Sequence, residues 1–194
     1  MFIVENIVES SVQDAIEQFV TSRMFPWYFD TATIDVNELP TESDSVVVRK
    51  GLNPFQFTHV VIRDSKQNTQ YFNLISPIVE NLSKELKSDL QIVRAKFNFL
   101  AQDTSSIHHW PHIDLSDDDH PDLKTAIYYV NETDGDTYIF NESAPLSADS
   151  VTIDQQISPK KGKIIVFDAN RFHASSSPVI SKKRIVLNIV FKIL

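Results

Sequence analysis

His112 and Asp114 lie two positions apart in the segment His112-Ile113-Asp114, and this spacing suits metal chemistry. In an extended segment, residues i and i+2 point to the same side, so the imidazole and the carboxylate would converge while Ile113 faces away. A pair of this kind, taken alone, is more often two surface residues than a metal site. A metal centre at this position therefore requires a further ligand elsewhere in the chain.

His173 supplies a candidate for that ligand. It follows the apolar run from Ile164 to Phe167, which predicts a strand, and we expect His173 at the end of that strand, at the mouth of a barrel. By itself His173 would be read as a histidine of the core or the surface. Together with His112 and Asp114 it completes the facial triad of two imidazoles and one carboxylate, which leaves three positions of Fe(II) open for oxygen chemistry.

Arg184 adds a second kind of signal, because it heads the apolar strand predicted from Arg184 to Ile193. A charged side chain that points inward from such a strand is costly unless an anion pairs with it. A guanidinium suits the two-oxygen recognition of a carboxylate, so a carboxylate-bearing co-substrate would meet this need. The alternative is an exposed arginine at the strand edge, beside Lys182 and Lys183.

The elements that must position these residues follow from the hydrophobic pattern. The N-terminal part predicts a short strand within residues 1–8, a helix that begins at Ser10 or Ser11 and ends before Phe25, and a helix from Asn73 to Leu90 that Asn73, or Ser76 with Pro77, would begin. Residues 30–58 read as loops around a short strand at 46–48, and the aromatic residues among 25–29 read as core. Later strands are predicted at 91–100, 124–130, 137–140, 151–157, 163–167 and 184–193.

Helices first and strands later predict an α+β protein. Its core is expected to be a double-stranded β-helix, that is a jelly roll of the cupin type, in residues 91–194, with residues 1–90 forming mainly helical support and loops. The length of 194 residues favours a single domain over residues 1–194. Composition supports a folded chain, with 42% hydrophobic residues and thirteen Phe.

Charge and cysteine content narrow the functional classes. The formal net charge of -8 argues against a protein that coats nucleic-acid phosphates, and the cluster of Lys160, Lys161 and Lys163 reads as a solvated turn. The absence of Cys removes disulfides, thiolate metal sites and cysteine nucleophiles. The sequence contains no signal-peptide pattern and no long apolar stretch, so we expect a cytoplasmic protein without a membrane partner.

The chain resembles the Fe(II)/2-oxoglutarate-dependent oxygenases, and among them the prolyl 4-hydroxylase-like group, from about Arg94 to Phe191. The resemblance rests on His112-x-Asp114, the segments 125–131 and 134–140, His173, and Arg184 with its apolar strand. It implies that His112, Asp114 and His173 bind iron. It also implies that Arg184 pairs with the distal carboxylate of 2-oxoglutarate and that Tyr129 donates its hydroxyl to the same carboxylate. Tyr129 also fits by strand alternation, because it would face inward with Ile127 while Tyr128 faces the other way.

The sequence departs from the family pattern in places. The family often has two glycines where this chain has Asp134-Gly135, so the hairpin there is expected to differ. Some relatives use a lysine in place of Arg184, and Lys183 is adjacent, but the strand phase favours Arg184. Asn98 or Gln102 would contact the metal-bound end of 2-oxoglutarate.

Four features beside the triad stay without an assigned role. His108, His109 and Trp110 read as exposed loop residues or as part of the substrate entrance. Residues 117–122 read as a solvated acidic loop that would cover the site, and they lack the Gly and Glu positions of a calcium loop.

The resemblance implies a dioxygenase that couples decarboxylation of 2-oxoglutarate to succinate and CO2 with hydroxylation of a substrate, a prolyl residue being one candidate. The cofactors are then Fe(II), 2-oxoglutarate and dioxygen. The substrate, a peptide, a protein or a small molecule, and the oligomeric state are not specified by the sequence. Two alternatives stay open, namely a non-catalytic jelly-roll binding module and an enzyme with another divalent metal on the same fold, although the second leaves Arg184 and Tyr129 without a purpose.

Overall fold

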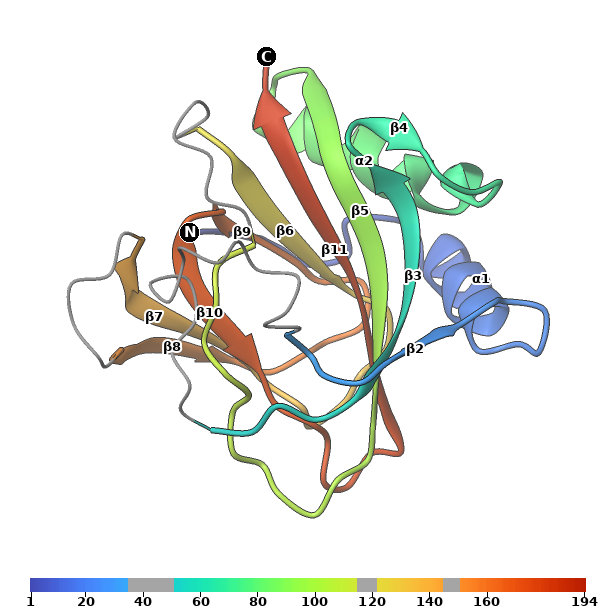
Figure 1. The fold of residues 1–194 in the computed structure, drawn as a ribbon. Coiled ribbons are helices and arrows are strands. Elements are labelled where there is room, and N and C mark those ends of the chain that lie inside the picture. The colour runs from blue at the N-terminus through green and yellow to red at the C-terminus, as the bar shows by residue number, and fades with distance from the viewer. Residues whose placement is uncertain (35–50, 115–121, 145–150) are drawn as a thin grey trace.

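The computed structural model describes residues 1–34, 51–114, 122–144 and 151–194, and within them two antiparallel sheets and two helices (Figure 1). The predicted strand at 46–48 and most of the acidic segment 117–122 lie outside these residues. The elements in chain order are β1 (Phe2–Val4), α1 (Ser10–Val20), β2 (Tyr28–Asp30), β3 (Gln56–Arg63), β4 (Lys66–Gln67), α2 (Phe72–Leu86), β5 (Leu90–Ala101), β6 (Lys124–Tyr129), β7 (Thr137–Ser143), β8 (Ile153–Ile157), β9 (Ile164–Asp168), β10 (Arg171–Ser175) and β11 (Lys183–Ile193).

The major sheet has the order β1-β9-β6-β11-β5-β3-β2, with β4 paired to β3, and the minor sheet has the order β10-β7-β8. Figure 1 shows α1 and α2 on the outer side of the major sheet and the minor sheet on its other side. This is the two-sheet jelly roll that the sequence predicts, so the expected α+β fold class is confirmed.

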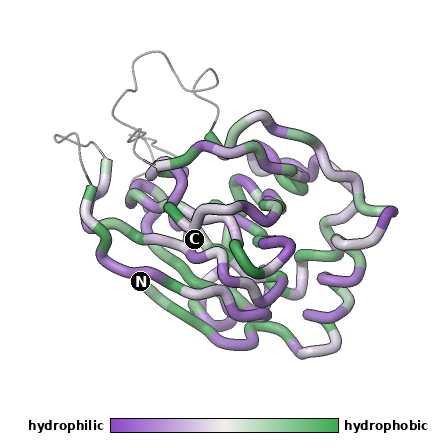
Figure 2. The backbone as a smooth tube through the Cα atoms, turned by 90° about the horizontal axis from the view of Figure 1, so that it is seen from below, coloured by the Kyte–Doolittle hydropathy of each residue, from purple (hydrophilic) through white to green (hydrophobic). Residues whose placement is uncertain are grey.

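Strand alternation gives the central strands of the major sheet two buried faces. On the outer face, Tyr128 and Leu187 join a core cluster with helix residues such as Ile16 of α1 and Ile78 of α2. On the inner face, residues of β6, β9 and β11 pack toward β7 of the minor sheet, and this cluster comprises Ile127, Tyr129, Ile139, Ile157, Ile165, Phe167 and Val186. Hydrophobic and hydrophilic stretches accordingly follow one another along the tube in Figure 2. The inner face is the one that carries the candidate site.

The N-terminal part of the chain contributes more sheet than predicted. β3 lies inside the major sheet, paired with β5 and β2, although its N-terminal end was read as loop. Its residues Gln56 and Thr58 are buried but polar, because they face the interior between the sheets, and this hides the strand from a hydrophobic pattern. Residues 1–90 thus add β2 and β3 to the major sheet, beyond the helices and loops expected of them.

Both helices form where the pattern predicts them but differ at their ends. The residue that precedes α1 is Glu9, with no side-chain cap, and Ser10 is already helical. α2 begins before Asn73, holds Pro77 inside its second turn, and ends at Leu86 with Lys87 in a left-handed conformation. The aromatic run is only partly core, since Phe25 is buried whereas Tyr28 is 62% exposed and Phe29 is 60% exposed.

Candidate metal centre

His112 and His173 come from segments that pair directly through their backbones. The amide of each residue donates to the carbonyl of the other, both at 2.9 Å, in an isolated antiparallel bridge between His112 and β10. The pairing brings the two ring centroids to 4.5 Å. His173 therefore lies inside its own strand in the minor sheet, and not at the end of the strand before it as the sequence suggested.

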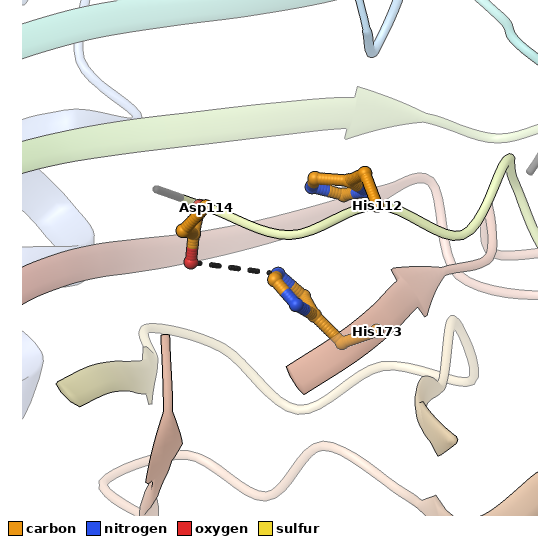
Figure 3. Close-up of side chains that lie close together, drawn as sticks. All are labelled: His112, Asp114 and His173. Carbon is orange, nitrogen blue, oxygen red and sulfur yellow. Dashed lines mark ion pairs between the residues drawn. The ribbon is translucent and has the colours of Figure 1, made fainter. Parts of the chain in front are cut away.

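Asp114 completes the group, as the i, i+2 spacing predicts (Figure 3). One potential ligand atom from each of His112, Asp114 and His173 lies within 4.8 Å of the others, and Nε2 of His173 is 3.5 Å from Oδ2 of Asp114. Ile113 faces the opposite way and is buried with Phe140 in a separate apolar cluster. Alternation along one short extended segment thus sends two polar side chains inward and an apolar one outward.

The two imidazoles are oriented by backbone carbonyls. Nδ1 of His112 donates to the carbonyl of Trp110 at 3.2 Å, and Nδ1 of His173 donates to that of Arg171, also at 3.2 Å. A proton held on Nδ1 leaves Nε2 with a free lone pair, which is the form that binds a metal. Burial, together with the neighbouring His173, lowers the pKa of His112 to about 3, so His112 is neutral at physiological pH.

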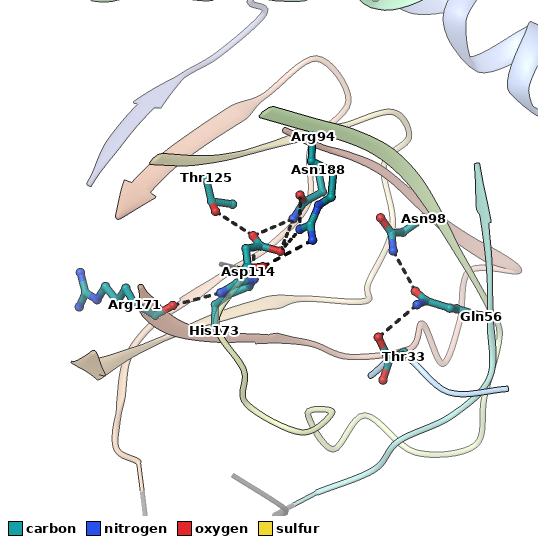
Figure 4. A network of polar contacts seen from close by, with 9 residues as sticks. All are labelled: Thr33, Gln56, Arg94, Asn98, Asp114, Thr125, Arg171, His173 and Asn188. Carbon is teal, nitrogen blue, oxygen red and sulfur yellow. Dashed lines mark hydrogen bonds and ion pairs between the residues drawn. The ribbon is translucent and has the colours of Figure 1, made fainter. Parts of the chain in front are cut away.

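The Asp114 carboxylate is surrounded by hydrogen-bond donors (Figure 4). Arg94 forms an ion pair with Oδ1, Thr125 donates to Oδ2 at 2.8 Å, and Asn188 donates to Oδ2 at 3.0 Å. Burial alone would raise the pKa of Asp114, but Arg94, the two imidazoles and Asn188 together hold it far below its usual range. The carboxylate is thus ionised, and the triad as a whole is ready to take a cation.

Arg184 is buried at the other end of the same inner face, with an exposure of 3%. Its guanidinium donates to the Gly135 carbonyl and to Oγ1 of Thr137, both at 2.9 Å. Among the described residues no carboxylate lies within ion-pair distance of it. Burial lowers the pKa of Arg184, and Tyr129 and Asp136 only partly oppose that shift. Arg184 is therefore a buried cation with only neutral hydrogen-bond acceptors.

Tyr129 lies beside Arg184, as strand alternation predicts. Its hydroxyl donates to Oγ1 of Thr137 at 2.9 Å, and burial raises its pKa to about 12, so the phenol keeps its proton at neutral pH. Thr137 receives hydrogen bonds from both Tyr129 and Arg184 and so fixes the two side chains with respect to each other.

The triad and Arg184 open into one cavity. Besides these residues the cavity is lined by Thr33, Gln56, Lys96, Asn98, Leu100, Ile127, Thr137, Ala174, Ser175, Val186 and Asn188. Asn98 donates to Oε1 of Gln56 at 2.9 Å, and its own Oδ1 is buried without a hydrogen-bond partner among the described residues. Gln102 lies outside the cavity, is exposed, and donates to the Val179 carbonyl at 2.6 Å.

Several residues around the cavity were not anticipated. His109, read as a loop or entrance residue, is 1% exposed and lies between Ser175 and Ser177, at 3.1 and 3.2 Å from their hydroxyls. Burial, the Arg184 charge and His108 lower the pKa of His109 to about 3. Arg94 was missed as well, although strand alternation from Asn98 would have placed it on the same face.

The remaining predicted residues lie away from the chemistry. His108 is partly buried, and its ring packs 5.5 Å from that of Tyr138. The lysine cluster is neutralised, since Lys161 pairs with Asp14 and Glu17 while Lys160 and Lys163 pair with Glu5. This arrangement agrees with the interpretation of the cluster as a solvated turn.

Asp134, which stands where the family often has glycine, holds the loop before β11. Its carboxylate accepts the backbone amides of Val179, Ile180 and Ser181, each at 2.8 Å. The next residue, Gly135, leaves no room for a side chain, because a Cβ atom there would lie 2.7 Å from the Ser176 carbonyl oxygen and 2.9 Å from Cδ of Arg184. The backbone at Gly135 thus packs directly against Arg184.

Known structures share this fold. A 2OG-Fe(II) oxygenase family oxidoreductase from Burkholderia pseudomallei is similar with a TM-score of 0.63 and 10% identity, over 98% of this chain and 84% of that one. A prolyl hydroxylase from Trichoplax adhaerens, in complex with a hypoxia inducible factor peptide fragment, has a TM-score of 0.59 and 12% identity, over 98% and 82%. The epimerase SnoN, in complex with Fe3+, alpha ketoglutarate and nogalamycin RO, has a TM-score of 0.56 and 10% identity, over 98% and 77%.

These likenesses are structural, and at such low identities they show the fold. No family model and no curated protein matches the sequence. The jelly roll expected from the resemblance to the Fe(II)/2-oxoglutarate-dependent oxygenases is thereby confirmed. In the part of the chain that the structure describes, no helix is long and apolar enough to cross a membrane.

Proposed function

We propose that this protein is a non-haem Fe(II)- and 2-oxoglutarate-dependent dioxygenase, with His112, Asp114 and His173 as its metal ligands. The observation that carries the proposal is that the same cavity contains the triad and the buried Arg184, which has no carboxylate partner among the described residues. A facial triad leaves room for a chelating co-substrate, and Arg184 supplies the charge for that co-substrate's far end. A dicarboxylate that chelates through a keto acid group answers both needs.

The donor set fits Fe(II). Two imidazoles and one carboxylate form the set of a mononuclear iron oxygenase site, and the absence of Cys leaves no softer ligand to compete. Fe(II), 2-oxoglutarate and dioxygen together supply the oxidation, in which decarboxylation of 2-oxoglutarate to succinate and CO2 is coupled to hydroxylation of a substrate. The protein's part is to bind, orient and shield these partners.

Several residues in and beside the cavity then have a proposed role. Arg184 pairs with the distal carboxylate of 2-oxoglutarate, and Tyr129, which keeps its phenolic proton, turns that proton from Oγ1 of Thr137 to the same group. Ile127 and Val186 line the cavity between this pocket and the metal ligands and exclude water from the aliphatic part of the co-substrate. His112 and His173 hold their protons on Nδ1, away from the metal.

The reaction is proposed as a hydroxylation, with a peptide or a small molecule as substrate. The similar structures named above include a prolyl hydroxylase with a peptide and an epimerase with a small molecule, so a prolyl residue is one candidate among these. A non-catalytic binding module does not account for two imidazoles that backbone carbonyls orient beside an ionised carboxylate. An enzyme with Zn or Mn and no 2-oxoglutarate leaves Arg184 buried without a counter-charge.

The proposal is tested by uncoupled turnover. Purified protein is loaded with Fe(II) without oxygen, mixed with 2-oxoglutarate, exposed to air and assayed for succinate, across a panel of peptides, amino acids and nucleic acids. We expect succinate that depends on both Fe(II) and oxygen and that rises with the true substrate. Metal binding without any succinate under these conditions would favour the other-metal alternative, and no metal binding would favour the binding module.

A further inference from the structure

Arg94 lies directly behind the metal ligand Asp114. Its Nη2 forms the ion pair with Oδ1, and its Nη1 lies 3.5 Å from the Asp114 backbone carbonyl, so one guanidinium holds both the side chain and the main chain of this ligand. The Asp114 side chain is 5% exposed and that of Arg94 is 26% exposed. The two imidazoles of the triad are instead oriented by the backbone carbonyls of Trp110 and Arg171.

Asn188 is oriented by the same arginine. Its Oδ1 accepts from Nη2 of Arg94 at 3.3 Å, which turns its Nδ2 toward Asp114, 3.0 Å from Oδ2 and 3.3 Å from Oδ1. An amide that accepts on one side must donate on the other, so the orientation of Asn188 follows from the arginine and needs no further assumption. Thr125 adds its hydroxyl to Oδ2 at 2.8 Å.

The two carboxylate oxygens of Asp114 therefore differ. Oδ2 lies on the side of the triad, 3.5 Å from Nε2 of His173, whereas Oδ1 is engaged by the Arg94 charge (Figures 3 and 4). A carboxylate can bind a metal through one oxygen or through both. Oδ2 accepts from the neutral donors Thr125 and Asn188, whereas Oδ1 is paired with a cation, so Oδ2 is the oxygen that the carboxylate offers to a metal.

We propose that Arg94 is a positioning residue that makes Asp114 a one-oxygen ligand and so keeps three coordination positions open. This inference rests on the proposed function, in which a chelating 2-oxoglutarate takes two of those positions and dioxygen takes the third. Arg94 also places a positive charge beside the metal. That charge opposes binding of the bare cation and favours binding of an anionic co-substrate.

Loss of Arg94 should affect binding of the metal and binding of 2-oxoglutarate in different ways. In Arg94→Met, Oδ1 is released and the carboxylate can bind through both oxygens, so Mn(II) should bind as tightly as in the wild type or more tightly. Binding of 2-oxoglutarate to the Mn(II)-loaded protein should weaken by about tenfold or more, within the usual range for a residue behind a metal ligand. Arg94→Lys, which keeps the charge, should fall between the two.

Both affinities are measured by titration calorimetry without oxygen, and Co(II) absorption spectra report the change in coordination without any turnover. Lys161→Met is the matched control, because Lys161 is a 25% exposed cation that pairs with carboxylates far from the cavity, and neither affinity should change. If Arg94→Met does not fold, Arg94→Lys carries the test, with Mn(II) affinity kept and 2-oxoglutarate affinity reduced.

Two results would overturn the inference. One is that metal and 2-oxoglutarate affinities fall together with the thermal stability of the metal-free protein, which would make Arg94 a purely structural residue. The other is that both affinities stay at wild-type values. A wild-type protein that binds neither ligand would contradict the proposed function itself, so the two failures can be told apart.

Discussion

Arg94 and Arg184 lie at the two ends of one inner sheet face and are compensated in different ways. Arg94 has a carboxylate partner in Asp114, and Asn188 and Thr125 complete the hydrogen bonds around that carboxylate. Arg184 is more deeply buried, yet it donates only to a backbone carbonyl and a threonine hydroxyl. The protein itself thus supplies the counter-charge of Arg94, whereas for Arg184 it supplies only neutral acceptors, as the proposed anion site requires.

The two arginines therefore differ in the free-energy cost of their burial. A charged group buried without a partner is costly, and neutral acceptors only partly offset that cost. At the metal end the donors are in place before the cation arrives, which preorganises the ligands. In the proposed function, 2-oxoglutarate relieves this cost at the Arg184 end, because its distal carboxylate supplies the missing counter-charge.

The largest effect is expected at the metal end. His112→Ala or Asp114→Ala removes one of only three ligands, so metal binding and all iron-dependent turnover of 2-oxoglutarate should be lost. Circular dichroism should still show the folded protein. Calorimetric titration with Mn(II) and a succinate assay measure the loss, and full activity in both variants would contradict the assignment of the triad.

Arg184→Ala should leave the metal site intact and weaken the binding of 2-oxoglutarate. Loss of one partner of a buried charged pair costs roughly 2 to 5 kcal/mol, so the dissociation constant of 2-oxoglutarate should rise by about 30-fold or more. Mn(II) affinity should stay close to that of the wild type. An unchanged requirement for 2-oxoglutarate would point to Lys183 as the carboxylate partner and would break the contrast between the two ends.

Gly135→Ala perturbs the Arg184 end without removing its charge. A Cβ atom 2.9 Å from Cδ of Arg184 forces that side chain to shift, and overpacking of this kind costs about 1 to 3 kcal/mol of stability. We expect a weaker loss of 2-oxoglutarate affinity than in Arg184→Ala. Gly162→Ala is the control, because its Cβ meets Gln13 far from the cavity, so it should lower the melting temperature and leave the affinity unchanged.

The smallest effect concerns pH and His109, which lies near Arg184. Burial lowers the pKa of His109 to about 3 in the folded protein, from an ordinary value of about 6.5, so the unfolded chain binds a proton that the folded protein does not bind. Stability from this residue is therefore present above about pH 6.5 and is lost as the pH falls toward 3, by up to about 1.4 kcal/mol per pH unit.

Urea unfolding of the metal-free protein at pH 7, 6 and 5 measures that slope. In His109→Gln the decline toward acid pH should be shallower, because one proton fewer is taken up on unfolding. If the free energy of unfolding changes equally with pH in the variant and the wild type, His109 is protonated in the folded protein. Arg184 would then have a second positive charge near it.

The parts of the site that follow strict alternation were predictable from sequence. His112 and Asp114 converge because they are two positions apart, and Arg184 points inward because it shares a strand face with Val186 and Asn188. The phase of β6 places Tyr129 in the inner cluster and Tyr128 in the outer one, as expected. In each case the spacing within one extended segment determines the face to which the side chain points.

Features that depend on pairing between distant segments were not predictable. Arg94 meets Asp114 only because β5 pairs with β11 in one particular register, with Val190 opposite Arg94. β3 was missed because its inward residues Gln56 and Thr58 are polar and line the interior. His173 was placed one strand too early, because the short β10 becomes a strand only by pairing with β7.

In the proposed function, one cavity binds a metal at one end and the far carboxylate of 2-oxoglutarate at the other. The most direct test is equilibrium dialysis of labelled 2-oxoglutarate against the protein, without oxygen, with and without Fe(II). We predict one equivalent bound only when Fe(II) is present, and strongly weakened binding in Arg184→Ala. Binding that ignores the metal, or no binding at all, would contradict the account.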